Sequence, residues 1–334
     1  MIHCAHYKLI ALSALLALPA CAGVIATAPP SSYPAERRMF YDAAQRVIGL
    51  PDGSQVVIYQ PDLPNGRPPA MRVFIVAPGN DRDRDRSFRL ETFIADEIAG
   101  DYPGQIRSAA MSPDHQRLAF IGGWFSAHDK HGHNGVFVLR WKDSGKTWVL
   151  QSWFDVPDLA LGDIAFGPDD LLLVTSRPHA ETSAPSGIIV FTMAGQKMGS
   201  FIETPAKVLE TRLARLSDDA YALYDSQAER VRFLRLKNTS VVEERTVPIP
   251  FPTERVNLVA FDPRPDGRIV FGRTIVVDHK SKTYVTVVDN AGTVIEEWQP
   301  TTAWRLGYAD QEHVLHGIET TSRPGPTVAA VKVR

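Results

Sequence analysis

The chain has 334 residues, of which 44% are hydrophobic and 22% are charged. This composition is ordinary for a globular protein, and the length is sufficient to bury a sizeable core. The 36 basic and 38 acidic residues give a formal net charge of -2. This balance argues against a nucleic-acid-binding protein, because such proteins carry an excess of Lys and Arg or a basic face.

The N-terminus has the features of an export signal. An apolar run over residues 9–18 follows a single Lys and ends in small residues. A run of about ten apolar residues is too short to span a bilayer but suits the hydrophobic region of a signal peptide. The sequence LPAC at residues 18–21 resembles the lipobox of bacterial lipoproteins. The resemblance implies that residues 1–20 are removed and that Cys21 carries a lipid. Pro19 departs from the usual lipobox residue, so cleavage after Ala22 by ordinary signal peptidase is the alternative.

The cysteine content favours the lipoprotein. Cys4 and Cys21 are the two cysteines of the chain, and Cys4 lies inside the predicted signal peptide. After cleavage no pair remains to form an internal disulfide. We therefore expect a protein anchored by lipid to a membrane of the bacterial cell envelope and facing the periplasm, with a soluble periplasmic or secreted protein as the alternative.

Residues 21–37 are rich in Ala, Pro and Ser and are predicted to form a linker. At ~3.3 Å per residue, 17 residues reach at most roughly 55 Å, so the folded domain is expected close to the membrane.

The remainder of the chain is predicted to be all-β. Short runs rich in Val, Ile, Phe and Tyr, such as SQVVIYQ and GVFVLRW, alternate with Gly, Pro, Asp and Asn, and no segment keeps a sustained helical spacing of apolar residues.

A repeat runs through these strands. Six segments share the order strand, turn with an aspartate, strand; the turn aspartates are Asp52, Asp114, Asp169, Asp218, Asp266 and Asp310. Their spacings of 62, 55, 49, 48 and 44 residues lie near the roughly 40 to 50 residues of a propeller blade. Where the turn reads Pro-Asp-Gly it is well specified, because Pro fixes φ, Asp bonds the backbone and Gly accepts a positive φ.

The turn motif resembles the WD40-like, TolB-type repeats of exported bacterial propellers, whose hallmark is Ser-Pro-Asp-Gly before an apolar strand. Ser112-Pro113-Asp114 is the best copy and Pro265-Asp266-Gly267 the next. The resemblance implies a β-propeller over residues 38–334, with six four-stranded blades. We expect an N-terminal strand near Arg38–Asp42 to complete the last blade and close the ring. The two widest spacings are long enough to contain a seventh blade, which is the alternative to six.

A histidine-rich loop is the first candidate site. FSAHDKHGHN is expected to join the second and third strands of the second blade, on the face where the innermost strands begin. It contains His128, Asp129, His131 and His133, which are ligand types for Zn or similar ions. The spacing matches no established zinc motif. A solvated polar loop and a divalent metal site (Zn or Ca) are therefore both open, and no other cofactor is expected.

A group of polar residues at the starts of the innermost strands is the second candidate site: Arg46, Arg107, Arg212, Asn257 and Arg305. Arginines that converge on one channel mouth would attract a carboxylate, a phosphate or an acidic peptide. The alternative is that each arginine pairs with an acidic residue of the neighbouring blade.

The sequence carries no nucleophile elbow, no phosphate-binding glycine loop and no cysteine nucleophile after processing. We therefore predict a monomeric, non-catalytic scaffold that binds an envelope protein or peptide. The alternatives are a metal-dependent, lactonase-like hydrolase and a binding protein for small anions. Of the expected innermost-strand residues, Asn257 and Asp163 could begin the metal cluster that such lactonases use.

Overall fold

The computed structural model describes residues 25–27, 31–32, 44–49, 55–59, 72–76, 86–89, 102–125, 132–142, 147–156, 159–178, 187–202, 211–226, 228–252, 256–309, 313–319 and 327–333. The predicted signal peptide, the predicted lipid-attachment residue Cys21 and the turn residues Asp52 and Asp310 lie outside these ranges. Within them, no helix has the length and apolar character needed to cross a membrane.

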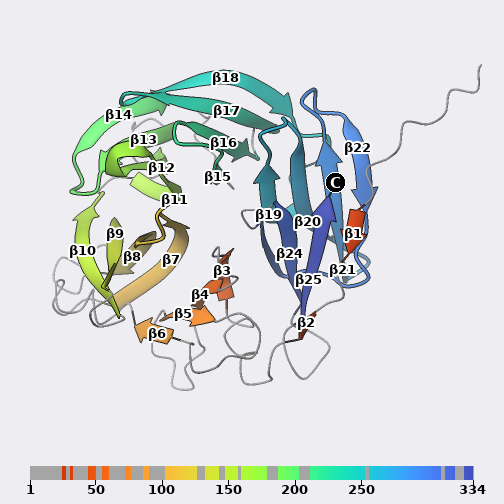
Figure 1. Cartoon of the computed structure of the whole chain (residues 1–334), viewed down its shortest axis with the longest axis horizontal. Helices are drawn as coiled ribbons and strands as arrows, with labels where there is room; N and C mark the ends of the chain where they lie inside the picture. The colour runs from red at the N-terminus through yellow and green to blue at the C-terminus, as the bar shows by residue number, and fades with distance from the viewer. Residues whose placement is uncertain are drawn as a thin grey trace, which may run out of the picture.

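The described chain folds into six antiparallel sheets that are arranged around a central axis (Figure 1). The first sheet contains β3 (Ala44–Gly49), β4 (Gln55–Tyr59), β5 (Arg72–Val76) and β6 (Arg86–Arg89). The second contains β7 (Tyr102–Met111), β8 (Arg117–Phe125), β9 (Gly132–Lys142) and β10 (Thr147–Asp155). The third contains β11 (Leu159–Phe166), β12 (Leu171–Pro178), β13 (Gly187–Thr192) and β14 (Lys197–Ile202), with a turn of 3₁₀ helix, η3 (Pro168–Asp170), after its first strand.

The remaining sheets repeat this order. The fourth contains β15 (Thr211–Arg215), β16 (Ala220–Asp225), β17 (Arg230–Lys237) and β18 (Ser240–Pro248). The fifth contains β19 (Val256–Pro263), β20 (Ile269–Val277), β21 (Lys280–Val288) and β22 (Val294–Trp298). The sixth contains β23 (Leu306–Ala309), β24 (Val314–Glu319), β25 (Thr327–Val333), β1 (Ile25–Thr27) and β2 (Ser31–Ser32).

The first strand of each sheet lies innermost. Each of these strands contacts the next around the ring, in the order β3, β7, β11, β15, β19, β23, and β23 contacts β3 again. The ring is therefore closed, and the architecture is the predicted β-propeller with six blades among the described residues.

The hydrophobic core lies between the blades. One cluster joins Val56 and Ile58 of β4 to Phe120 and Phe137 of the second blade, and comparable clusters join each following pair of blades through to the sixth. Each fully buried large apolar side chain contributes about 1.5–3 kcal/mol relative to exposure. Because each interface belongs to two blades, packing between blades holds the ring together.

The turn after the innermost strand is built as the sequence predicts in the four blades where it is described. In the second blade, Ser112 Oγ donates to Asp114 Oδ1, the same oxygen accepts the Gln116 N–H at 3.1 Å, and His115 takes a positive φ of 57°. In the fifth, Asp266 accepts the Arg268 N–H at 3.0 Å and Gly267 has a φ of 89°. Desolvation acts to raise the pKa of Asp114, but the hydrogen bonds from Ser112, Gln116 and Arg117 outweigh it and lower the pKa below its ordinary value.

The last blade is completed from the N-terminal side, but by different residues from those predicted. β1 pairs with β25 through Ile25↔Val333, and β2 pairs with β25 through Ser31↔Val328. Residues 38–42, which we expected in this position, lie outside the described ranges. The linker predicted over residues 21–37 is thus partly wrong, because β1 and β2 fall inside it. The physical reason is that pairing satisfies the backbone groups on the outer edge of β25, and the short strand at Ile25–Thr27 supplies this pairing.

Candidate functional site

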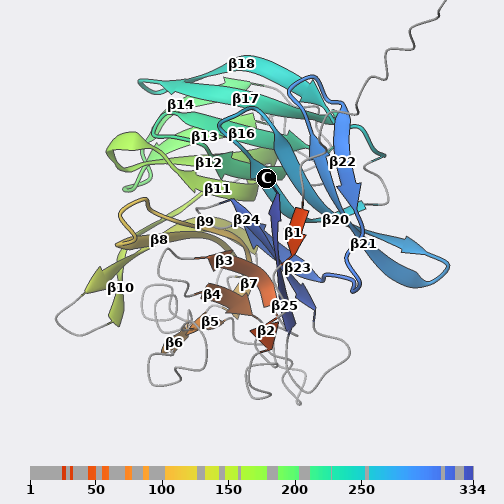
Figure 2. The ribbon, with the colours of Figure 1, turned by 45° about the vertical axis from the view of Figure 1, so that its right-hand side comes forward.

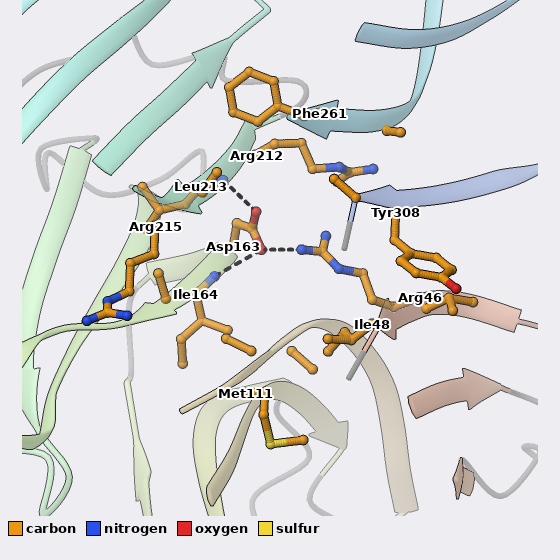
Figure 3. A pocket seen from close by; sticks show the side chains of 18 of the residues that line it. Arg46, Ile48, Met111, Asp163, Ile164, Arg212, Leu213, Arg215, Phe261 and Tyr308 are labelled. Carbon is orange, nitrogen blue, oxygen red and sulfur yellow. Dashed lines mark hydrogen bonds and ion pairs between the residues drawn. The ribbon is translucent and has the colours of Figure 1, made fainter. Parts of the chain in front are cut away.

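A cavity of about 510 Å³ lies at the centre of the ring (Figure 3). All six innermost strands line it. Arg46, Arg212 and Asn257 lie near the starts of their strands, and Arg305 directly precedes β23, so these four side chains share one end of the cavity, here called the mouth. Four different blades each supply an apolar side chain to the lining: Ile48, Met111, Ile164 and Phe261.

Asp163 of β11 is the organising residue of the mouth. Its side chain is buried, and its Oδ1 accepts hydrogen bonds from Ser108 Oγ of β7 and from the Ile164 N–H at 3.0 Å. Its Oδ2 accepts the Leu213 N–H of β15 at 2.6 Å. Arg46 Nη2 of β3 lies 3.4 Å from Oδ1 and completes the set (Figure 3). One carboxylate therefore joins the inner strands of four blades, an arrangement that satisfies its charge in a buried position.

The structure brings together four of the five residues of the predicted arginine group. Arg46, Arg212, Asn257 and Arg305 line the cavity, whereas Arg107 is not among its lining residues and is exposed. Arg107 Nη1 lies 3.4 Å from the carbonyl oxygen of Leu161 on the next blade. The strand β7 shifts register on both sides of Ile106. Such irregularities change the direction of side chains. Arg107 therefore aligns with Arg46 and Arg212 in the repeat but does not line the cavity with them.

The contacts of Arg46 and Arg212 bear on the alternative that each arginine pairs with an acidic residue of the neighbouring blade. Arg46 pairs with Asp163, which lies two blades away and not on the neighbouring blade. Arg212 Nη2 instead lies 3.4 Å from the carbonyl oxygen of Leu258, on the next blade. A carbonyl accepts a hydrogen bond but does not neutralise a guanidinium charge.

The charge balance of the cavity follows from these residues. The described residues that line it include the cations Arg46, Arg212, Arg215 and Arg305, and a single carboxylate, Asp163. Asp163 is buried behind its four donors, so its charge is already engaged. Arg215 lies at the turn end beside Asp218, so the mouth itself contains three guanidinium groups and one carboxylate among the described lining residues. Guanidinium forks suit carboxylate and phosphate in particular.

Two lining residues escaped the sequence analysis. Arg215 lies at the end of β15, where its Nη2 is 2.6 Å from Asp218 Oδ1, so it was missed by a search of strand starts. Tyr308 of β23 is fixed by Gln55 Nε2, which donates to its Oη at 2.9 Å, and by stacking on His316 at 4.7 Å between ring centroids. A Cβ on Gly49 would approach Tyr308 Cε2 to 2.6 Å. A larger residue at position 49 would clash with the Tyr308 ring, which explains the glycine there.

The histidine-rich segment is divided by the structure. The β8–β9 connection does join the second and third strands of the second blade, but β9 begins at Gly132, so His133 lies in a strand. His133 Nδ1 is 2.9 Å from Asp155 Oδ2 of β10. His128, Asp129 and His131 lie outside the described residues, and the part that is described contains no group of three or more metal-ligating side chains.

Comparison with known proteins supports the fold alone. No family model matches the chain, and no curated protein matches it in sequence. The periplasmic gluconolactonase of Pseudomonas aeruginosa is similar in structure, with a TM-score of 0.51, 12% identity and coverage of 86% of this chain and 85% of the gluconolactonase chain. The hemagglutinin-neuraminidase ectodomain of parainfluenza virus 5 also has a TM-score of 0.51, with 10% identity and coverage of 84% and 79%. Both likenesses define the class of protein, a β-propeller, and at such low identity they carry no activity to this chain. The TolB-type relationship stays a prediction from the turn motif.

Proposed function

We propose that this protein is a lipid-anchored β-propeller of the bacterial cell envelope that acts as a non-catalytic scaffold. Its mouth binds an anionic group, a carboxylate or phosphate, of a protein, peptide or small-molecule partner. The observation that carries the proposal is the composition of the mouth, where Arg46, Arg212 and Arg305 lie with one carboxylate, Asp163, among the described lining residues.

The shape of the site supports binding at the mouth. The cavity volume of about 510 Å³ lies within the range of ligand pockets, roughly 300–1,000 Å³. Apolar side chains line the cavity below the mouth, and a lower local dielectric strengthens the attraction between guanidinium groups and an anion. Asp163 holds Arg46 in a fixed position, which reduces the entropy lost when a ligand binds.

The path of the N-terminal strand bears on the anchor. Ile25 lies four positions after Cys21 and pairs with Val333. Val333 is at the end of β25, and this end of β25 lies beside the start of β24. The turn from β23 to β24 lies at that end, so it is the end opposite the mouth. Four residues span at most ~13 Å. A lipid on Cys21 would therefore hold the turn face near the membrane and leave the mouth directed away from it, open to partners.

Thermal unfolding in the presence of anions tests the proposal. Citrate and inorganic phosphate are expected to raise the unfolding temperature of the full-length chain by a few degrees at concentrations well above Kd. The double variant Arg212→Ala with Arg305→Ala should lose this gain. The control is Arg140→Ala with Lys197→Ala, which removes two exposed cations away from the cavity. Equal gains in both double variants would contradict a site at the mouth.

A further inference from the structure

A hairpin beside the mouth carries an exposed aliphatic side chain. The strands β20 and β21 extend to a two-residue turn at Asp278 and His279, whose φ values of 51° and 62° match the tight turns that suit β-hairpins. Figure 2 shows this hairpin projecting beyond the rest of its blade. Val276, next to the turn, is 70% exposed. An aliphatic side chain in this position has no role in the core of the blade.

The hairpin tip lies on the same side of the ring as the mouth. Asn257, which lines the cavity, is the register partner of Thr274. Val276 is two residues further along the same strand and therefore on the same face as Thr274, ~7 Å beyond it. The Thr274 hydroxyl donates to the carbonyl oxygen of Trp304 at 3.0 Å, and the next residue is Arg305 of the mouth. The face that exposes Val276 is thus the face that borders Arg305.

The position of this face is well fixed. Trp304 is buried, its N–H donates to Thr283 Oγ1 at 2.7 Å, and Thr283 and Thr274 are hydrogen bonded to each other at 2.8 Å. These bonds join the hairpin to the segment that leads into β23. The exposed valine and the arginines of the mouth are therefore held in a constant relation, which is what a composite binding surface requires.

The hairpin also adds positive charge. Lys280 is the register partner of Val277, and Lys282 is that of Ile275. Lys280 is exposed and Lys282 is half-buried. Because Val276 pairs with Ser281, both lysines lie on the other face of the hairpin. The face that runs from the mouth to the hairpin tip therefore carries arginines and then an aliphatic side chain. A free small anion would use the cations and leave Val276 in water, whereas an extended peptide with acidic and aliphatic residues would use all of them.

We propose that the mouth and the β20–β21 hairpin together bind an acidic peptide segment of a partner protein. An acidic side chain enters the mouth between Arg212 and Arg305, and an adjacent aliphatic side chain packs on Val276. This inference rests on the proposed function, since it names the kind of ligand that brings the anionic group.

Fluorescence anisotropy with the full-length protein in mild detergent tests the inference. The probe is a rhodamine-labelled octapeptide of alternating Glu and Leu, capped at both ends. Val276→Ser is expected to weaken binding about fivefold, because one aliphatic contact is lost, and to leave stabilisation by citrate unchanged. The matched control, Val294→Ser, alters a valine that is 41% exposed at the opposite end of the blade and should bind as the wild type. A peptide with Ser in place of Leu should bind the wild type and Val276→Ser equally.

The outcomes separate this inference from the proposed function. Undiminished binding by Val276→Ser, with binding lost in Arg212→Ala with Arg305→Ala, overturns the role of the hairpin and leaves the anion site. Undiminished binding by the double arginine variant overturns both. Binding to phosphatidylglycerol vesicles that Val276→Ser abolishes, without any binding of the peptide, would assign the hairpin to a lipid surface and overturn the peptide.

Discussion

The two ends of the central channel use arginine in opposite ways. At the turn end, arginines lie against carboxylates of their own turns or of the next blade: Arg117 with Asp114 at 3.3 Å, Arg215 with Asp218 at 2.6 Å, Arg264 with Asp262 at 3.0 Å and Arg268 with Asp266 at 2.6 Å. At the mouth, one buried carboxylate, Asp163, stands among several lining arginines. Arginine thus lies in ion pairs with turn carboxylates at one end, and at the other end it supports the proposed anion site.

The largest effect is expected from removing the carboxylate of the mouth. Asp163→Ala leaves the buried Leu213 and Ile164 N–H groups without their acceptor and Arg46 without its anion. We expect a loss of about 3–5 kcal/mol in the free energy of unfolding, measured by urea denaturation. Asp218→Ala removes a carboxylate whose side chain is 92% exposed at the turn end, and should cost less than about 0.5 kcal/mol. Similar losses in the two variants would remove the contrast between the ends.

A smaller effect is expected from acid at the turn end. The pKa values of Asp114 and Asp266 are lowered: desolvation opposes the shift, and hydrogen bonds from Ser112 and from Arg268 outweigh it. A lowered folded-state pKa gives stability that is present above the unfolded value of about 3.9 and is lost as the pH falls through the folded value.

The variant Asp114→Asn with Asp266→Asn should therefore be less stable than the wild type at pH 7, and the difference should vanish below the folded pKa values. Because both carboxylates are about half exposed, solvent screening limits the difference to a few tenths of a kcal/mol. Unfolding temperatures measured between pH 7 and pH 2 give the result. A difference that grows toward acid would show that the sign is wrong.

The smallest effect is expected at the histidine-rich segment. His133 is held by Asp155, and the proposed function needs no metal. Elemental analysis of the dialysed full-length protein should find no equivalent of Zn or Ca, and His131→Ala with His133→Ala should leave the metal content and citrate binding unchanged. One equivalent of metal that disappears in this variant would establish a metal site and favour the metal-dependent hydrolase.

The sequence predicted what local chemistry determines. Ser112-Pro113-Asp114 and Pro265-Asp266-Gly267 form the turns that their residues specify, and the six repeats correspond to the six sheets. The starts of the innermost strands were also visible, because the repeats align Arg46, Arg212 and Asn257.

The remainder depends on contacts between distant residues. Arg46 and Asp163 are 117 positions apart, so no local pattern showed that Asp163 would join four blades. The same applies to the register shift at Ile106 that removes Arg107 from the cavity, and to the pairing of Ile25 with Val333 that completes the last blade. These features arise only when the ring closes, which is a property of the whole chain.

Anion binding at the mouth can be measured by calorimetric titration of citrate into three forms of the full-length protein at low ionic strength. We expect the wild type to bind citrate and Arg212→Ala with Arg305→Ala to lose binding. Arg235→Ala with Arg268→Ala should bind as the wild type does, because both arginines are paired with acidic residues at the turn end. Equal binding by all three forms, or loss in the turn-end variant alone, would contradict anion binding at the mouth.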